Sequence, residues 1–326
     1  MKRTLVTGGA GFIGGHLARR LLDRGESVVA LDDLSTGNRD NIPAESENGR
    51  FRLVVGDVRD KELVDELVQD CDAVVHLAAR IGLKLVIESP LRTMEVNANG
   101  TESLLAAATR YGKRTLVAST SEVYGLATKI PSSESDPISF GSPEVGRWSY
   151  ACSKVFDEFL ALALCRERGL KATVVRLFNT VGPRQSAYYG MVIPRFVRQA
   201  LAGEPLTVYG DGTQTRSFCY VGDVVDALLA ILDRNAGIGE VYNVGNPSEI
   251  TILDLAKRVI ELTGSDSKIE FVPFDVAYTA GFEEIRRRVP DIARARRELG
   301  FNPATTLDVI LRDVIESVRT PQPVAR

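Results

Sequence analysis

Tyr150 and Lys154 stand four positions apart, a spacing with a clear chemical use. On a helix, residues four apart lie on one face, so the phenol and the ammonium would be neighbours. A free phenol has a pKa of about 10, too high for a base at neutral pH. A neighbouring ammonium and a positively charged cofactor ring would each lower that pKa and make Tyr150 a general base. A surface pair without a role is the alternative reading of this spacing alone.

A glycine string, Gly8–Gly14, follows a short apolar run and opens a predicted helix. Missing side chains let the backbone turn tightly and approach a pyrophosphate, which then lies on the helix N-terminus. A plain glycine-rich turn would explain the string, but Asp32 ends the second predicted strand, where a carboxylate can accept hydrogen bonds from an adenosine ribose. The residues predicted for this part of the site are Gly8, Gly11, Phe12, Ile13, Gly14 and Asp32.

Asp32 also discriminates between cofactors, because its charge would repel the 2′-phosphate of NADP. We therefore predict that the cofactor is NAD. Asp57, at the end of the third predicted strand, is placed to meet the adenine amino group, with a turn-forming aspartate as the alternative. Small residues after the fourth predicted strand would let the backbone pass close to the pyrophosphate. The further cofactor candidates are Asp57, Val58, Leu77, Ala78 and Ala79.

These side chains need a framework, and the first half of the chain predicts one of alternating strands and helices. The predicted strands are 4–7, 27–31, 51–55, 73–77, 114–119 and 173–178. The predicted helices between them are 12–24, 61–68, 100–111 and 154–168. Because each parallel crossover needs a helix, this alternation predicts an α/β fold with a doubly wound, Rossmann-type parallel sheet.

After about residue 180 the alternation loosens. Helices are predicted at 192–202, 223–233, 252–263 and 307–318, separated by segments rich in glycine, proline and aromatic residues. We expect a smaller α/β lobe here, with the ligand site in the cleft between the lobes. The predicted division is 1–178 for cofactor binding and 179–320 mainly for the substrate, with the chain free to cross between the lobes.

The composition limits the partners. A net charge of −3 gives no general attraction to nucleic acid or to anionic membranes. The four cysteines are scattered and there are only two histidines, so no Cys/His metal site is predicted. No apolar run approaches the roughly 20 residues of a membrane span, and glycines come too early for a signal peptide. We expect a cytoplasmic protein with reduced thiols.

Taken together, these motifs resemble the extended short-chain dehydrogenases that act on nucleotide-sugars, over nearly the whole chain. The segments that carry the resemblance are 7–14, 76–79, 119–125, 150–154, 176–183 and 215–221. The resemblance implies that Tyr150 takes a proton from the sugar 4-hydroxyl while hydride passes from C4 to tightly held NAD⁺. It further implies that Thr120 bonds the same oxygen, that Lys154 bonds the nicotinamide ribose, and that the NAD is recycled.

The resemblance also implies a UDP-sugar substrate held by the second lobe. Asn179, Arg216 and Arg288 match positions that bind the nucleotide diphosphate, and Tyr209 is expected near the uracil. Guanidinium groups suit a diphosphate because they offer planar, paired donors. For Arg216 the alternative is a structural surface arginine. For Arg288, which lies in a basic run, the alternative is that it forms part of a solvated face.

Ser121 and Glu122, directly after Thr120, separate the possible reactions. The triplet resembles UDP-glucuronate decarboxylases, as do segments 146–150 and 288–292. Oxidation at C4 makes the C5 carboxylate β to a ketone, so loss of CO₂ leaves a stabilised enolate. Ser121 and Glu122 would orient the ring and relay a proton at C5, and an arginine of the second lobe, Arg216, would help to position the carboxylate.

Two alternatives stay open. Segment 182–190 looks more like epimerase relatives, so 4-epimerisation of UDP-glucose or UDP-glucuronate is a close rival. A catalytically inactive NAD-binding regulatory protein is the remote alternative, against which the intact set of Thr120, Tyr150 and Lys154 argues.

A homodimer is also expected. In relatives, helices equivalent to 100–111 and 154–164 pack against their symmetry mates as a four-helix bundle. The second of these helices has apolar residues at helical spacing, which are Val155, Phe159, Leu162 and Ala163. The alternative is that this stripe packs on the sheet.

Overall fold

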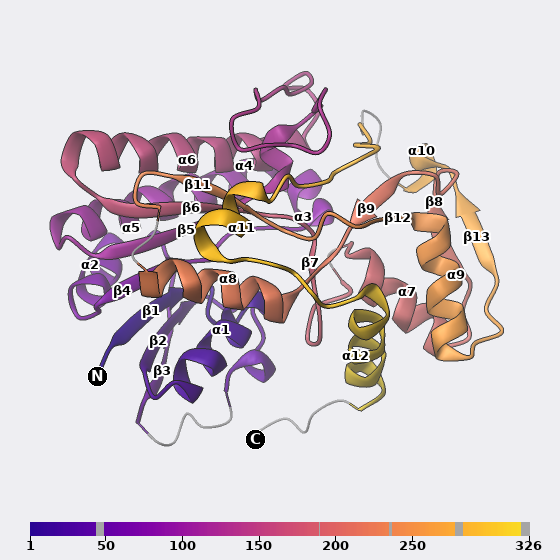
Figure 1. The fold of residues 1–326 in the computed structure, drawn as a ribbon, viewed down its shortest axis with the longest axis horizontal. Helices are drawn as coiled ribbons and strands as arrows, with labels where there is room; N and C mark the ends of the chain where they lie inside the picture. The colour runs from indigo at the N-terminus through magenta and orange to yellow at the C-terminus, as the bar shows by residue number, and fades with distance from the viewer. Residues whose placement is uncertain (44–48, 189, 235–236, 278–282, 321–326) are drawn as a thin grey trace.

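A seven-stranded parallel sheet forms the centre of the protein (Figure 1). The computed structural model describes residues 1–43, 49–188, 190–234, 237–277 and 283–320. The strand order is β11-β6-β5-β4-β1-β2-β3. The strands are β1 (Arg3–Thr7), β2 (Ser27–Asp32), β3 (Phe51–Val55), β4 (Ala73–His76), β5 (Arg114–Thr120), β6 (Lys171–Leu177) and β11 (Val241–Val244). All seven residues of β5 are buried, as expected for a parallel strand covered on both faces.

Helices cover both faces of the sheet. On one face, α1 (Phe12–Asp23), α8 (Val221–Arg234) and α11 (Ala293–Leu299) share a hydrophobic core with the strands. On the other, α2 (Lys61–Gln69), α5 (Gly100–Arg110) and α6 (Trp148–Arg168) do the same. Val6 of β1 belongs to the first core, and its neighbour Leu5 belongs to the second. Because successive side chains of a strand point to opposite faces, the two cores lie on opposite faces of the sheet. The predicted doubly wound sheet is confirmed.

β1 lies where the strand order reverses, with β2 and β3 on one side and β4, β5 and β6 on the other. In open α/β sheets, ligands bind at such a reversal, outside the carboxyl ends of the strands. The loops after β1 and β4 meet here, and Leu77 N–H donates to the Thr7 carbonyl at 3.1 Å. The sheet therefore positions the glycine loop and the 77–79 segment against each other.

α6 begins at Trp148, six residues before its predicted start, so Tyr150 and Lys154 stand on one helix. It ends where Gly169 adopts a left-handed conformation with φ of 70°, a conformation that costs glycine little. The catalytic candidates are thus held by a 21-residue helix rather than by a loop.

The smaller lobe, on the right in Figure 1, has a core of its own. Its helices α7 (Val192–Leu201), α9 (Ile252–Thr263) and α12 (Leu307–Arg319) pack around Phe196, Leu255 and Leu311. The short strands are β7 (Thr180–Val181), β8 (Leu206–Tyr209), β9 (Thr215–Ser217), β10 (Cys219–Tyr220), β12 (Glu249–Thr251) and β13 (Ile269–Val272). The other short helix of this lobe is α10 (Phe274–Ala277). The short helices α3 (Leu83–Glu88) and α4 (Pro90–Met94) belong to the large lobe, where α4 packs against α6.

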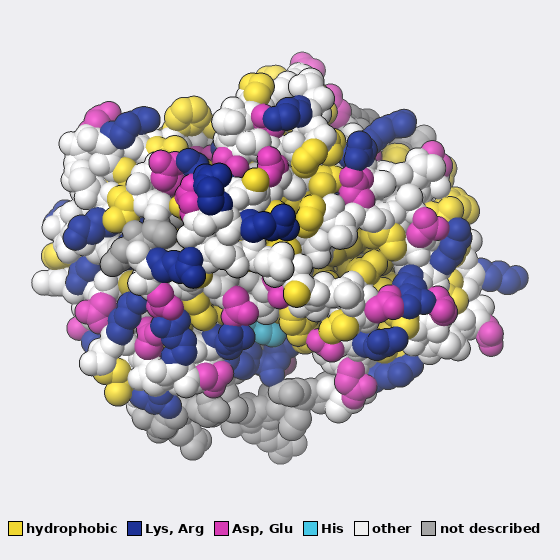
Figure 2. All heavy atoms as spheres, viewed as in Figure 1, with side chains coloured by type: hydrophobic (Ala, Val, Ile, Leu, Met, Phe, Trp, Pro, Cys, Tyr) yellow, Lys and Arg dark blue, Asp and Glu magenta, His cyan; other side chains and the backbone are white. Residues whose placement is uncertain are grey.

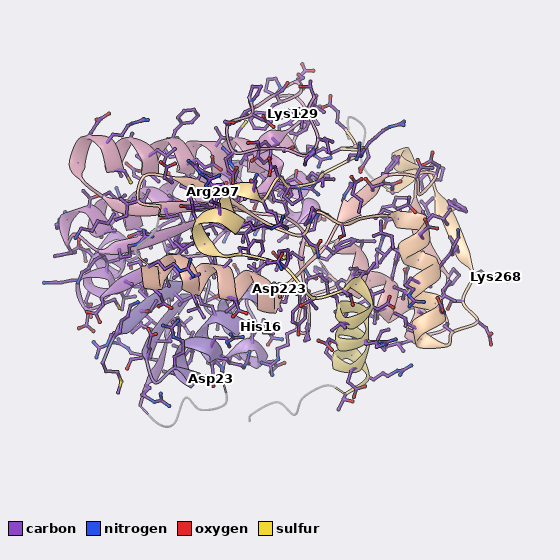
Figure 3. All side chains as sticks on the ribbon, viewed as in Figure 1. His16, Asp23, Lys129, Asp223, Lys268 and Arg297 are labelled. Atoms are coloured by element: carbon purple, nitrogen blue, oxygen red, sulfur yellow. The ribbon has the colours of Figure 1, made fainter. Side chains whose placement is uncertain are left out.

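The chain crosses between the lobes more than once. α8, β11 and α11 follow residue 178, yet they pack on the large sheet, where β11 pairs with β6. His16 Nε2 lies 3.0 Å from the Pro183 carbonyl, and Thr305 Oγ1 donates to Asp223 at 3.1 Å. His16 and Asp223 are labelled in Figure 3, close to where the lobes meet. A division at residue 178 stays a prediction, since later segments complete the first core.

The surface shown in Figure 2 carries charges of both signs, interspersed rather than gathered in one large patch. Among the described residues, no helix is both long and apolar enough to pass through a bilayer. All four cysteines are free thiols, and two of them, Cys71 and Cys219, are buried.

Candidate active site

A cavity of about 850 Å³ opens at the carboxyl ends of the sheet strands and is lined by both lobes. Every residue predicted for the cofactor, for catalysis and for the substrate lines it. From the first lobe these are Gly8, Gly11, Phe12, Ile13, Gly14, Asp32, Asp57, Val58, Leu77, Ala78, Ala79, Thr120, Ser121, Glu122, Tyr150 and Lys154. From the rest of the chain they are Asn179, Tyr209, Arg216 and Arg288. The fold thus brings the candidates together, while the role of each stays a prediction.

The glycine loop forms one wall of the cavity. Gly8 has φ of +70°, and a Cβ there would lie 2.8 Å from the backbone nitrogen of Ala78. A Cβ on Gly14 would lie 2.2 Å from the Gly8 carbonyl oxygen. Both positions therefore need glycine, the first for its backbone angle and both for close approach. No described side chain caps α1 at Gly11, so the N–H groups at its start can face an anion such as a pyrophosphate.

Asp32 is anchored on this loop. Its side chain accepts hydrogen bonds from the backbone N–H groups of Ala10 and Leu34, at 2.9 Å each. Burial raises the pKa of Asp32, and these hydrogen bonds act in the opposite direction. The carboxylate still lines the cavity, where its remaining lone pairs can accept from two ribose hydroxyls. Together with the glycine cradle, this environment fits an NAD molecule.

Asp57 has a different environment from the predicted one. The Arg59 guanidinium donates to its two oxygens, at 3.0 Å from Nε and 2.5 Å from Nη2. This side-chain contact lowers the pKa of Asp57. The contact of Asp57 with an adenine amino group stays a prediction. The 77–79 segment is held differently, since Ala78 N–H donates to Thr7 Oγ1 at 3.2 Å.

Tyr150 and Lys154 are both buried at the cavity wall. Lys154 Nζ donates to Asp157 Oδ2 at 3.0 Å, within a buried pair. Burial and the nearby Glu122 carboxylate raise the pKa of Tyr150, and the Thr120 hydroxyl acts against them. The protein's own groups thus raise the pKa of Tyr150. The predicted lowering also depends on the charge of the cofactor ring, and it stays a prediction. The ammonium is paired with Asp157, and negative charges face the phenol.

Glu122 lies in a tight turn, residues 121–124, that follows β5, and its N–H donates to Thr120 Oγ1 at 3.2 Å. Its carboxylate sits between two arginines. Arg147 Nη2 donates to one oxygen at 3.1 Å, and Arg288 donates to the other. Although burial opposes ionisation, the charges of Arg288 and Arg147 hold the pKa of Glu122 at about 2. Glu122 is thus ionised at neutral pH and compensated on both sides.

Arg288 connects the second lobe to this turn. Its side chain is only 15% exposed, so it does not form part of a solvated face. Besides Glu122, it contacts Asn179, whose Oδ1 accepts from Nη2 at 3.3 Å, and Ser121, whose Oγ is 3.5 Å from Nη1. Its buried Nε has no hydrogen-bond partner in the described parts of the chain. Binding of a diphosphate by Arg288 and Asn179 stays a prediction.

Arg216 and Tyr209 line the part of the cavity that belongs to the smaller lobe. Arg216 pairs with Glu284, and burial lowers its pKa. It is therefore a cavity residue rather than a surface arginine. The guanidinium of Arg195 lies 4.1 Å from the centre of the Tyr209 ring, and Gln214 Nε2 donates to the Tyr209 carbonyl at 2.8 Å. The predicted contact of Tyr209 with uracil stays a prediction.

Charged residues in or beside the cavity that the sequence does not predict include Arg147, Glu284 and Asp157. Arg147 stands three positions before Tyr150, and its only signal is the resemblance of segment 146–150. Glu284 pairs with Arg216, which lies 68 positions away in the sequence, and no local pattern predicts such a pair. Asp157 had a usable signal, because a carboxylate three positions after a lysine on a helix is placed to pair with it.

Comparisons with known proteins cover nearly the whole chain. The family model described as GDP-mannose 4,6 dehydratase matches residues 5–314. The UDP-N-acetyl-alpha-D-glucosaminuronate decarboxylase of Bacillus cytotoxicus is 42% identical over 98% of each chain. UDP-glucuronic acid decarboxylase 1 of Danio rerio is 37% identical over 97% of this chain and 72% of that one. The crystal structure of Thermus thermophilus UDP-glucose 4-epimerase in complex with NAD matches with a TM-score of 0.85 and 31% identity, over 98% of this chain and 99% of that one.

Proposed function

Because this chain belongs to the GDP-mannose 4,6 dehydratase family of extended short-chain dehydrogenases, we propose that it is an NAD-dependent decarboxylase of UDP-glucuronate. The named decarboxylases among its relatives support this reaction. One of them is named for the N-acetylated uronate, so that substrate belongs in the same test. A 4-keto sugar would be the intermediate.

The observation that carries the proposal is the cluster of arginines around Glu122. Three guanidinium groups, those of Arg147, Arg216 and Arg288, meet two carboxylates, Glu122 and Glu284. These five groups have one more guanidinium than carboxylate, next to the Thr120 hydroxyl, while the neighbouring Glu283 carboxylate accepts from Trp148 Nε1 at 3.0 Å. A uronic acid brings a carboxylate on C5, adjacent to the reacting C4, and this excess charge would compensate it. A neutral hexose has no such requirement.

The chain's own residues would divide the work at C4. Tyr150 would take the proton of the 4-hydroxyl, with Thr120 bonding the same oxygen. Lys154 has three N–H donors, and the structure describes a hydrogen bond for one of them, which leaves donors for the nicotinamide ribose. When bound, NAD⁺ supplies the hydride acceptor and later the donor at C4. The residues of the glycine loop and Asp32 would hold it.

Loss of CO₂ would follow from the position of the new ketone. The C5 carboxylate is β to that ketone, so its departure leaves an enolate that the ketone stabilises. Ser121 and the predicted Arg216 would orient this part of the ring. Glu122 would hold Arg288, whose Nη1 lies 3.5 Å from Ser121 Oγ, beside them. C5 would then take a proton from solvent, relayed by Ser121. Return of the hydride to C4, and of the proton from Tyr150 to the C4 oxygen, would complete the reaction.

The deciding experiment supplies UDP-glucuronate and UDP-N-acetylglucosaminuronate to the purified, NAD-loaded protein. Products are read by NMR, and CO₂ is trapped. We expect release of CO₂ with a UDP-pentose or UDP-4-keto-pentose. UDP-galacturonate without CO₂ would instead establish a 4-epimerase, and a solved relative is named UDP-glucose 4-epimerase. Net accumulation of NADH would show a dehydrogenase that consumes its cofactor, and bound NAD without conversion of any UDP-sugar would show an inactive binding protein.

Replacing Asp32 is expected to change cofactor choice. Asp32→Ala removes the ribose acceptor and the charge, so NAD should bind about 10- to 100-fold more weakly, the effect of losing a hydrogen bond to a charged group. Preference over NADP should fall as well. Asp32→Asn keeps one acceptor oxygen, which can serve Ala10 or Leu34 but not both, since they donate to different oxygens of Asp32. It should also lose the preference, with less loss of NAD affinity than Asp32→Ala. Fluorescence titration of cofactor-free protein measures both. Equal binding of NADP and NAD by the unaltered protein would contradict the role of Asp32.

The second part of the proposal is a homodimer. The predicted interface consists of helices 100–111 and 154–164, whereas the exposed apolar side chains lie on α6 and on α4, which pack side by side. Exposed apolar side chains recur on α6 at helical spacing, with Phe156 and Phe159 exposed by 47% and 64%. On α4, Leu91 is 70% exposed. The predicted stripe is thus partly wrong in phase, because Val155 and Leu162 pack inward while Phe159 faces out. A second copy of the chain would cover this face.

Phe159→Asp is therefore expected to convert the dimer into a monomer, because it places a charge in the centre of the buried face. Phe271→Asp is the matched control, since Phe271 is 52% exposed on β13, in the other lobe. Light scattering at micromolar concentration gives the mass. A monomeric mass for the unaltered protein, or a dimer that survives Phe159→Asp, would rule out this interface.

A cytoplasmic location is the last part of the proposal. The four free cysteines support a reducing compartment, since thiols persist there. Fractionation of cells that express the chain would test it.

A further inference from the structure

Asp157 is a buried carboxylate next to the catalytic candidates that the proposed mechanism does not use. It lies on α6, one turn after Lys154, and has no exposed surface. Its Oδ2 accepts a hydrogen bond from Lys154 Nζ at 3.0 Å. Its other oxygen is buried and has no hydrogen-bond partner among the described residues. A buried charge destabilises a protein unless an opposite charge or hydrogen bonds compensate it. The role of Asp157 therefore depends on the group that it pairs with.

Lys154 is the group that compensates Asp157. The adjacent carboxylate, Glu158, is engaged separately, since Arg176 Nη2 donates to it at 2.7 Å. On the neighbouring strand, burial and the charge of Lys154 lower the pKa of His76 to about 3, so this imidazole is neutral at working pH. Thr101, from α5, adds only a hydroxyl. Lys154 is therefore the cation paired with Asp157 among the described residues, and both charges still act on neighbouring groups.

We propose that Asp157 is a positioning residue of the reaction, which orients the Lys154 ammonium and sets the pH range in which Tyr150 acts as the base. The inference rests on the proposed function, because it assigns Tyr150 and Lys154 the roles proposed there. By taking one N–H of Lys154, Asp157 fixes the direction of the other two. By its own charge, it offsets the positive charge that would otherwise favour the Tyr150 phenolate.

The sign of the effect follows from the charges that face Tyr150. Burial, Glu122 and Asp157 raise the pKa of Tyr150, while Thr120 and Arg288 act in the opposite direction. Removing the charge of Asp157 takes away one of the groups that raise it. It also leaves the Lys154 ammonium uncompensated, which favours the phenolate further. Tyr150 would then ionise at lower pH.

The test is Asp157→Asn in the full-length protein. Turnover is measured as a function of pH with UDP-glucuronate and saturating NAD. We expect the acid limb of this profile to move to lower pH by about half a unit or more. NAD should bind about 2- to 10-fold more weakly, the effect of one misplaced hydrogen bond. NAD affinity is measured by fluorescence titration without substrate. Asp157→Glu, which restores the charge, should return the acid limb toward its original position.

Asp254→Asn is the matched control, because Asp254 pairs with Lys257 at the same spacing on α9, at 3.1 Å and exposed to solvent. It should change neither measurement. If Asp157→Asn does not fold, Asp157→Ser removes the same charge with a smaller side chain and carries the same expectations.

Two results together would overturn the proposal, even if Asp157→Asn is less stable. They are an acid limb within about 0.2 pH units of that of the unaltered protein, and an unchanged NAD affinity. Failure of the proposed function looks different. In that case the unaltered protein releases no CO₂ from UDP-glucuronate, while the NAD titrations still compare Asp157→Asn with its control. If Asp157→Asn and Asp254→Asn bind NAD with equal affinity, that result alone refutes the positioning role.

Discussion

Tyr150→Phe is expected to lower turnover of UDP-glucuronate by about 10²–10⁴-fold, the usual contribution of a general acid–base group. The substitution removes only the phenolic oxygen, so the ring still fills its buried place on α6. Binding of NAD and of the UDP-sugar should persist, since the glycine loop, Asp32 and the second lobe are untouched. Steady-state rates and titrations of both ligands separate the two effects.

Tyr242→Phe is the matched control. Tyr242 is also buried in the large sheet, and its hydroxyl donates to Glu298 at 2.7 Å, but it does not line the cavity. Its loss should lower stability and leave turnover close to that of the unaltered protein. A Tyr150→Phe variant that keeps its rate within about threefold would rule out Tyr150 as the base.

Glu122→Gln is expected to slow CO₂ release by about tenfold or more, relative to oxidation at C4, because it releases the arginine next to the ring. A glutamine offers one acceptor oxygen, where the carboxylate now serves both Arg147 and Arg288. Its amide N–H groups would repel the other guanidinium. NADH absorbance in rapid-mixing experiments follows the first step, and trapped CO₂ follows the second.

Glu249→Gln controls for the loss of a carboxylate paired with arginine. Glu249 accepts from Arg287 Nη2 at 2.6 Å, in the second lobe and away from the cavity lining. It should affect neither step. If Glu122→Gln slows NADH formation and CO₂ release by the same factor, Glu122 acts at C4 or on the fold, and the proposed role near C5 is wrong.

The parts of the site that the sequence predicts are those built from neighbours in the chain. Gly8 and Gly14 are needed for contacts within their own loop and with the adjacent one, so their spacing carries the prediction. Tyr150 and Lys154 share a helix, as their separation predicts, although the predicted helix begins only at Lys154. The fold class follows in the same way, from strands and helices that alternate locally.

The arrangement of charges could not be predicted, because it depends on distant pairs. Glu122 meets Arg288 across 166 positions, and nothing near either residue signals the other. The expected diphosphate contact of Arg288 was plausible from its type, yet in the structure its guanidinium serves a carboxylate of the protein. Burial decided the pKa of Tyr150 in the same unforeseen way.

Short or amphipathic elements were the second source of error. β11 has four residues and a sequence without a clear pattern, so its place at the edge of the large sheet came only from the structure. On α6, both faces carry apolar residues, so the exposed stripe could not be told from the buried one. Phe156 is exposed and Val155 packs inward, although they are neighbours.

The return of the chain to the large sheet has a consequence for synthesis on the ribosome. The core shared by α1 and the sheet includes Ala295, Leu299 and Phe301, near the end of the chain. While the ribosome is still adding these residues, the apolar surface of α8 and of the strands beneath it has no complete cover. Exposed sheet and helix surface of this kind favours association between nascent chains. The first lobe therefore closes only after residues 293–301 have been added, and a fragment ending at residue 178 would leave this face of the sheet without α8 and α11.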